Sequence, residues 1–161
     1  MHKFVSVDIK KCTGCRVCEY ICSIEKTKAF NPTQSRIRVA RIYPHTNAAL
    51  NCRMCEDAAC VTACPRKALS QSEETGVITV DDKLCNGCGW CVKACDFGAI
   101  LMDPKPTVYM CNLCSERDEG PACIQWCPEE ALELSTTNVL AQKSRIESVQ
   151  KLEQASGEAG K

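Results

Sequence analysis

Hydrophobic and polar positions alternate over four short stretches of the chain, which predicts small β-strands. The expected strands are Phe4–Asp8, Arg36–Ile42, Val77–Asp81 and Thr107–Met110. Short helices are expected to begin near four cysteines and to carry the last cysteine of each group. These cysteines are Cys18, Cys60, Cys91 and Cys123. The cysteine-free segment Ser23–Asn51 is expected to be a long connection. The pattern predicts an α+β fold of small elements.

Apolar positions beyond Leu134 follow a helical spacing instead. Ser135 to Thr137 can cap a helix. The apolar stripe consists of Val139, Ile146, Val149 and Leu152. It is too thin to hold a helix folded alone, so we expect the helix to dock on a partner or on a second copy of this chain; a frayed tail is the alternative. The sequence predicts a main domain over residues 1–134, then a C-terminal helix and mobile tail over 135–161.

The composition provides few large apolar side chains for an ordinary hydrophobic core. Among 161 residues there are only 3 Phe, 3 Tyr and 2 Trp, but there are 16 Cys. The N-terminal residues carry no export signal and no apolar run is long enough to cross a membrane, so we expect a cytoplasmic protein without membrane insertion. In a reducing cytosol, cysteines at this density are typical of metal ligands rather than of disulfides. The formal net charge of +0 counts every cysteine as a neutral thiol.

The cysteines divide into four groups of four, with none left over. They are Cys12, Cys15, Cys18 and Cys22; Cys52, Cys55, Cys60 and Cys64; Cys85, Cys88, Cys91 and Cys95; and Cys111, Cys114, Cys123 and Cys127. Groups one and three share the tight pattern C-x-G-C-x-x-C-x-x-x-C. Groups two and four are stretched, and both end in C-P followed by A-L. The chain is therefore a doubled unit with one tight and one stretched group in each half.

The tight spacing indicates iron–sulfur chemistry. Three cysteines within seven residues can wrap three corners of an iron–sulfur cube from one loop, and a fourth, farther along, can serve a neighbouring cube. Gly14 and Gly87 stand where the backbone must turn sharply. Structural zinc, the alternative, usually uses two C-x-x-C pairs separated by a dozen or more residues. Four complete quartets favour iron and sulfide over a zinc-bound interaction module.

Residues 77–100, with CTACPRKAL before them, resemble a bacterial two-cluster ferredoxin. The whole cysteine set, over residues 3–134, resembles the four-cluster iron–sulfur subunits of the dimethyl sulfoxide reductase type. The matching motifs are C-x₂-C-x₄-C-x₃-C-P at Cys52, C-x₂-C-x₈-C-x₃-C-P at Cys111 and SRIRVARIYP from Ser35. The resemblance implies two ferredoxin-like lobes, one from groups one and four and the other from groups two and three.

The resemblance also implies four [4Fe–4S] clusters with crossed ligands, because the last cysteine of each group would serve the other cluster of its lobe. The four ligand sets are named here by number. Quartet 1 is Cys12, Cys15, Cys18 and Cys127; quartet 2 is Cys52, Cys55, Cys60 and Cys95; quartet 3 is Cys85, Cys88, Cys91 and Cys64; quartet 4 is Cys111, Cys114, Cys123 and Cys22.

Two positions depart from the ferredoxin pattern. In groups two and four a proline follows the last cysteine. In groups one and three the equivalent residues are Ser23 and Asp96. One interpretation is that the position tolerates polar residues; the functional hypothesis is that the Asp96 carboxylate lowers the potential of the quartet 2 cluster. Trp90 and Trp126 lie within the cysteine motifs, where core packing is favoured over cluster shielding or docking.

The sequence contains no motif for catalysis of its own. It has no glycine-rich nucleotide loop and no basic stripe for nucleic acid, and His2 and His45 lie in no motif. We expect an electron-transfer subunit serving a large catalytic redox subunit. The resemblance suggests a tungsten or molybdenum pterin aldehyde oxidoreductase or formate dehydrogenase first, and a hydrogenase or carbon monoxide dehydrogenase next. A free polyferredoxin and a self-stacking conducting assembly are the alternatives.

Overall fold

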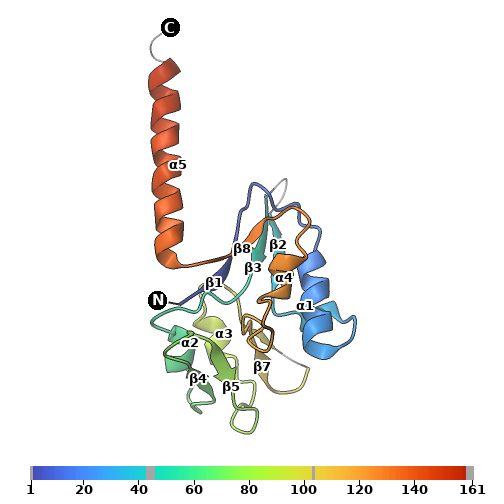
Figure 1. Ribbon diagram of the computed structural model, residues 1–161. Helices are drawn as coiled ribbons and strands as arrows, with labels where there is room; N and C mark the ends of the chain where they lie inside the picture. Colours follow the sequence, from blue (N-terminus) through green and yellow to red (C-terminus); the bar gives the residue numbers. More distant parts are fainter. Residues whose placement is uncertain (1, 43–45, 103, 159–161) are drawn as a thin grey trace.

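The computed structural model describes residues 2–42, 46–102 and 104–158, so His45 lies outside the described residues. Helices and small antiparallel sheets are mixed along the chain, as expected for an α+β fold (Figure 1). Each sheet in the described residues has two strands. Two-stranded sheets are marginal on their own, so the fold depends on what the loops between them hold.

All four predicted strands are present, in slightly shorter form, and each pairs with a strand that the pattern did not reveal. The antiparallel pairs are β1 (Phe4–Val7) with β8 (Leu132–Ser135), β2 (Arg38–Ile42) with β3 (Thr46–Leu50), β4 (Leu69–Gln71) with β5 (Ile78–Val80), and β6 (Leu101–Met102) with β7 (Val108–Tyr109). In the first pair Phe4 lies opposite Ser135 and Val7 opposite Leu132, which joins the two ends of the cysteine-bearing region.

Four helices form at the predicted places: α1 (Val17–Thr27), α2 (Ala59–Thr62), α3 (Trp90–Lys93) and α4 (Ala122–Gln125). The expectation that each carries its last cysteine was wrong for the three short helices. They contain the third cysteine of their group and end just before the fourth. In two of them the reason is Pro65 or Pro128, because the residue before a proline is disfavoured in helical conformation.

Helix α1 continues past Cys22, and Ser23 fits within it where a proline would not. Ser23 is fully buried, its hydroxyl donates to the Tyr20 carbonyl at 2.8 Å, and its own carbonyl accepts a hydrogen bond from Thr27 Oγ1 at 2.8 Å. A proline at this position would lack the helical N–H and would clash with the preceding turn. The departure from the ferredoxin pattern at Ser23 therefore has a structural explanation.

The segment Ser23–Asn51 has more structure than a connection needs. It contains the second half of α1, a short 3₁₀ helix η1 (Pro32–Gln34) and the β2–β3 hairpin. The buried Glu19 of α1 accepts a hydrogen bond from Val39 N at 2.6 Å, which fixes the hairpin to the helix. The alternation in β2 was readable, whereas TNAAL in β3 has few strand-favouring residues.

Two apolar clusters form the interior, and cysteines belong to both. The larger contains Phe4, Cys52, Met54, Ala58, Leu69, Ile78, Cys91, Ala99, Ile100, Val108, Met110 and Cys111. The smaller contains Val5, Cys18, Cys22, Ile37, Ala49, Cys123 and Leu132. Adjacent residues of β1 point into different clusters, as strand alternation requires.

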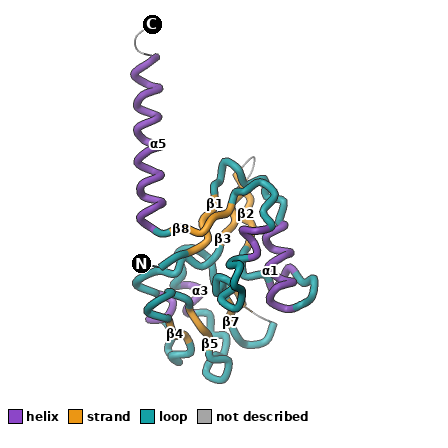
Figure 2. Tube along the Cα trace, in the orientation of Figure 1, coloured by secondary structure: helices purple, strands orange, loops and turns teal. Residues whose placement is uncertain are grey.

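The C-terminal helix α5 (Thr137–Glu158) projects away from the rest of the chain (Figures 1 and 2). Thr136 caps it by accepting a hydrogen bond from Val139 N at 3.5 Å. The helix includes residues 155–158, which the sequence analysis assigned to a mobile tail. The predicted apolar stripe is exposed, at 43% for Val139 and 69% for Leu152. No helix in the described residues is long and apolar enough to span a membrane.

Candidate metal centres

Two cavities are lined by the cysteines of quartets 1 and 3. One has all four cysteines of quartet 1 in its wall, including Cys127, which is distant in sequence from the other three. The second has all four of quartet 3, including Cys64 from the preceding group. In each case the fourth wall cysteine comes from a different group, so the chain brings these residues together in the crossed arrangement.

The thiols of quartet 2 lie close enough to interact electrostatically. Burial is the main cause that raises the pKa of Cys60 to about 11, and the nearby Cys52 and Cys95 raise it further. Burial also raises the pKa of Cys52, with added contributions from Cys55 and Cys95. Cys95 thus lies beside the cysteines of group two, from which it is separated in sequence.

The thiols of quartet 4 are all buried. Burial raises the pKa of Cys111 to about 12, and the neighbouring Cys22 and Cys114 contribute in the same direction. The pKa of Cys123 is raised by burial first, then by Cys111, Cys22 and Cys114. Cys22, at the centre of α1, therefore lies among the cysteines of group four.

The proximity of cysteines from different quartets shows the order in which the quartets lie along the molecule. Cys18 of quartet 1 also contributes to the raised pKa of Cys123 in quartet 4. Cys52 of quartet 2 contributes likewise at Cys111 of quartet 4. Quartets 2 and 3 are adjacent because α2 contacts α3 and each helix leads from one quartet into the other. The order through the molecule is quartet 1, quartet 4, quartet 2, quartet 3.

The ends of this order are the most exposed. Cys15 of quartet 1 and Cys88 of quartet 3 are the exposed cysteines of the chain. These two residues occupy the same position in the two tight groups. The interior quartet 4 has no exposed thiol.

Every group has a left-handed backbone conformation just before its second cysteine. Gly14 and Gly87 adopt φ of 72° and 67°, as the sequence predicted, but Met54 and Leu113 adopt φ of 50° and 57° at the equivalent places. A non-glycine residue there costs roughly 1–2 kcal/mol. Met54 is almost completely buried, so core packing offsets the strain. No residue-type signal in the sequence marks Met54 or Leu113 as turn residues.

Backbone N–H groups hydrogen-bond the sulfur of the last cysteine in each group. In three groups the donor is the alanine four residues later: Ala68 to Cys64 at 3.3 Å, Ala99 to Cys95 at 3.4 Å, and Ala131 to Cys127 at 3.3 Å. In group one α1 continues, and Arg36 N donates to Cys22 Sγ at 3.2 Å instead. Burial is the largest single influence on the Cys64 thiol and raises its pKa, but several backbone donors together outweigh it, so the pKa lies below its usual value. The sequence analysis noted the alanine in groups two and four without assigning it this role.

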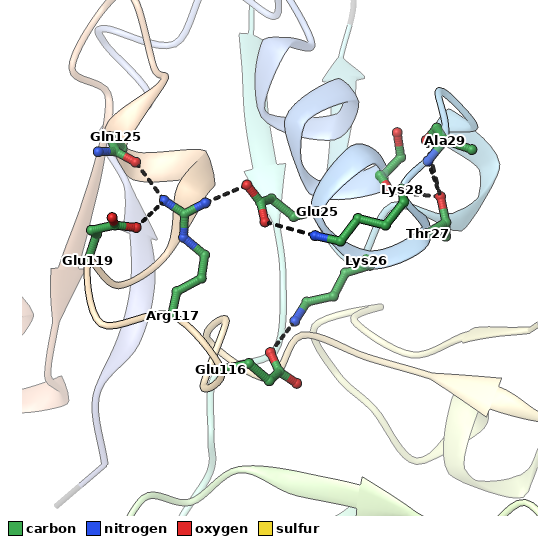
Figure 3. A network of polar contacts seen from close by, with 10 residues as sticks. Glu25, Lys26, Thr27, Lys28, Ala29, Glu116, Arg117, Glu119 and Gln125 are labelled. Carbon is green, nitrogen blue, oxygen red and sulfur yellow. Dashed lines mark hydrogen bonds and ion pairs between the residues drawn. The ribbon is translucent and has the colours of Figure 1, made fainter.

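The long spacer of group four is held against α1 by charged side chains (Figure 3). Arg117 is ion-paired with Glu25 of α1, and it also contacts Glu119 at 2.8 Å and Gln125 at 2.9 Å. Lys26, also on α1, contacts Glu116 at 2.7 Å, and this hydrogen bond is the main cause of the lowered pKa of Glu116. These contacts keep Cys114 and Cys123 beside Cys22 despite eight intervening residues.

The tryptophans were predicted to pack in the core, and that prediction was wrong. Trp90 is 62% exposed and Trp126 is 58% exposed. Trp90 lines the quartet 3 cavity, and Trp126 directly precedes Cys127 of quartet 1. Both rings therefore lie at the surface, one at each end of the quartet order.

Asp96 is exposed and lies near Cys55 of quartet 2. Burial is the largest cause of the raised pKa of Cys55, and the charges of Cys95 and Asp96 add to it. The carboxylate is therefore close to the quartet that the sequence hypothesis named.

The donor set fits a cluster held by thiolates. All sixteen cysteines are free thiols. Burial raises the pKa of five buried thiols, so these stay neutral until a cationic centre replaces their protons; they are Cys18, Cys52, Cys91, Cys111 and Cys123. Among the described residues, no three histidine, cysteine or carboxylate side chains converge on one point as ligands of a single ion would. The cysteines instead line cavity walls and receive backbone hydrogen bonds, as sulfur ligands of iron–sulfur clusters do.

A sequence profile of the 4Fe-4S dicluster domain matches residues 45–137, more than half of the chain. The chain belongs to the 4Fe-4S dicluster domain family. The matched segment includes groups two, three and four, while group one precedes it. This ferredoxin-type domain accounts for the mixed helices and small sheets and for the binding of [4Fe–4S] clusters.

Relatives of similar length carry names from electron transfer. The polyferredoxin-like subunit of an aliphatic sulfonate oxidoreductase from Pyrococcus furiosus is 41% identical over 133 residues, covering 80% of this chain and 75% of that protein. The thiosulfate reductase electron transfer subunit PhsB of Salmonella typhi is 34% identical over 137 residues, covering 78% and 71%. A chain of the BamBC active site complex of benzoyl coenzyme A reductase shares the fold, with a TM-score of 0.50 and 24% identity over 83% of this chain and 76% of that one.

Proposed function

We propose that this chain is an electron-transfer subunit that carries four [4Fe–4S] clusters, one in each of quartets 1 to 4. The observation that carries the proposal is the meeting of cysteines from different groups: Cys127 with the quartet 1 cysteines and Cys64 with those of quartet 3, each around one cavity. A bound cluster supplies one-electron acceptance and donation. The chain supplies the ligands, the order of the sites and the backbone donors to sulfur.

The order of the quartets would give electrons a path through the molecule. Quartets 1 and 4 would form one ferredoxin-like lobe over α1 and α4, and quartets 2 and 3 the other over α2 and α3. Cys111 and Cys52 belong to the same apolar cluster, so quartets 4 and 2 would join the lobes. Electrons would enter at one exposed end, beside Cys15 or Cys88, and leave at the other. Burial of all four thiols of quartet 4 would protect that cluster from water and oxygen.

The proposed partner is a large catalytic redox subunit. Two relatives are named as subunits of oxidoreductases, one acting on aliphatic sulfonates and one on thiosulfate. A molybdenum or tungsten pterin enzyme, such as an aldehyde oxidoreductase or formate dehydrogenase, is the first candidate, and a hydrogenase or carbon monoxide dehydrogenase the next. A dedicated subunit needs a surface for its partner, and exposed ends of the quartet order provide two.

Self-association is the second candidate, and it is favoured by α5. The helix projects from the body and exposes four apolar side chains along its length: Val139, Ile146, Val149 and Leu152. A diffusing polyferredoxin has no need of such a helix. A conducting assembly would use it to hold copies together.

Anaerobic purification of the tagged chain from its own cells distinguishes these functions. We expect brown protein that co-purifies with a larger subunit containing a pterin metal or nickel. A truncation at residue 137 keeps that subunit if α5 serves self-association and loses it if α5 holds the catalytic partner. Recovery of full-length protein as a brown monomer, without another subunit, would instead identify a free ferredoxin.

Asp96→Asn is expected to raise the potential of the quartet 2 cluster alone. Removing an exposed negative charge near Cys55 stabilises the reduced, more negative cluster by about 1 kcal/mol or less, which is roughly 20–40 mV for one electron. Potentiometric titration followed by EPR measures it. Glu74→Gln, on the β4–β5 turn, is the control and should change no potential. If all four potentials were unchanged in Asp96→Asn, the hypothesis would be rejected, and the position would simply tolerate polar residues.

A further inference from the structure

The turns after Cys64 and Cys127, at the two exposed ends of the quartet order, carry opposite charge on the same local scaffold. The turn after Cys64 of quartet 3 reads CPRKA, and the turn after Cys127 of quartet 1 reads CPEEA. Both turns end in a buried alanine whose N–H donates to the cysteine sulfur. Lys67 and Glu130 occupy equivalent positions, with φ of 51° and 47°. The backbone is therefore shared, and the side-chain charge is reversed.

More cations surround the quartet 3 turn. Arg66 Nε donates to the Leu84 carbonyl at 2.5 Å, which joins this turn to the loop that carries Lys83. Lys93, on α3, is exposed, as are Arg66, Lys67 and Lys83. The nearby carboxylates are engaged locally. Asp81 accepts from Lys83 N and Asp82 from Thr107 Oγ1, both at 2.9 Å.

An apolar centre lies among these cations. Trp90 is 62% exposed and Leu84 is 42% exposed, and Trp90 lines the quartet 3 cavity together with Arg66 and Cys88. Exposed tryptophan and arginine are the residues most enriched at binding hot spots. A charged ring around an apolar anchor steers a partner of opposite charge and then holds it. The approach also brings the partner directly over the exposed Cys88.

We propose that the surface formed by Arg66, Lys67, Lys83, Leu84, Trp90 and Lys93 docks an acidic face of a redox partner protein, with Trp90 as the apolar anchor. This inference rests on the proposed function. At the quartet 1 end the equivalent turn carries Glu129 and Glu130, which repel the same partner, and the exposed Arg16 lines that cavity as well. We therefore expect an acidic protein to prefer the quartet 3 end, where the turn itself is cationic and Trp90 is the anchor.

The two tryptophans of the chain provide the measurement. Protein containing 5-fluorotryptophan and reconstituted clusters gives two ¹⁹F resonances, which Trp126→Phe assigns. Octaglutamate serves as a minimal acidic polypeptide. We expect it to shift the Trp90 resonance and leave Trp126 unchanged, with affinity falling about tenfold or more between about 20 mM and about 200 mM salt.

The repeat itself supplies matched variants. The double variant Arg66→Glu, Lys67→Glu converts the CPRKA turn at quartet 3 into the CPEEA sequence found at quartet 1. It should weaken octaglutamate binding at least about tenfold. Glu129→Arg with Glu130→Lys writes CPRKA at quartet 1, and should create a response at Trp126. Equal shifts at both tryptophans, or an undiminished Trp90 shift in the first variant, would overturn the proposal.

Two further controls separate the remaining outcomes. Vesicles containing phosphatidylserine are titrated at the same salt, and a Trp90 response to vesicles but not to octaglutamate assigns the surface to lipid and overturns the proposal. Iron, sulfide and absorbance are measured on every sample beforehand. Protein that takes up no clusters refutes the proposed function, whereas protein with its clusters and no Trp90 response refutes only the docking surface.

Discussion

The double variant Cys12→Ala, Cys22→Ala is expected to lose two [4Fe–4S] clusters, although both substitutions fall within one cysteine group. Cys12 lines the quartet 1 cavity with Cys127, whereas Cys22 lies among the buried thiols of quartet 4. Each substitution therefore removes a ligand from a different cluster. Iron and sulfide content, with EPR of the reduced protein, gives the number of intact four-iron clusters, and two should remain.

The matched control is Cys12→Ala with Cys127→Ala, two residues far apart in sequence that belong to the same quartet. It should lose only one four-iron cluster and keep about twelve of about sixteen irons, since each cluster holds four. Ligand sets confined to single groups give the reverse result, with one cluster lost in the first double variant and two in the second. The comparison of the two variants thus separates crossed from local ligation.

The sequence predicted those parts of the site in which residue type and spacing carry the physics. Tight cysteine spacing indicated clusters, and Gly14 and Gly87 indicated a left-handed turn because glycine adopts positive φ without steric cost. Met54 and Leu113 take the same conformation without any such mark. Their turns are imposed by burial, which is a property of the folded chain and is absent from the local pattern.

The pairing of strands that lie far apart in the chain could not be predicted from the sequence either. Strand β8 pairs with β1 across almost the whole cysteine-bearing region, and its partner residues give no local signal of each other. Two of the helix ends were marked in the sequence, because Pro65 and Pro128 disfavour helical conformation at the residue before them. The exposed tryptophans show the limit of average burial. Trp90 and Trp126 are large and apolar, but the cysteines beside them are the proposed cluster ligands.

Removing the clusters is expected to unfold the main body of the chain. Helices α2, α3 and α4 have four residues each, and every sheet in the described residues has two strands, so neither is stable by itself. Both apolar clusters include ligand cysteines, such as Cys111 in the larger and Cys123 in the smaller. Metal binding in such small folds supplies folding free energy directly, about 10–16 kcal/mol for structural zinc and comparable to the whole stability of a typical domain.

Oxidation in the presence of a chelator removes the clusters, and the chelator alone is the control that leaves them in place. Far-ultraviolet circular dichroism during heating should show a cooperative transition for the intact protein and none for the stripped protein. The backbone amides of Val5 and Ile37, which are buried in the smaller apolar cluster, should lose their protection from hydrogen exchange. Anaerobic addition of iron and sulfide should restore both signals. A stripped chain that still melts cooperatively within about 5 °C of the intact protein would show that the apolar clusters suffice, because such a shift corresponds to only about 1–2 kcal/mol.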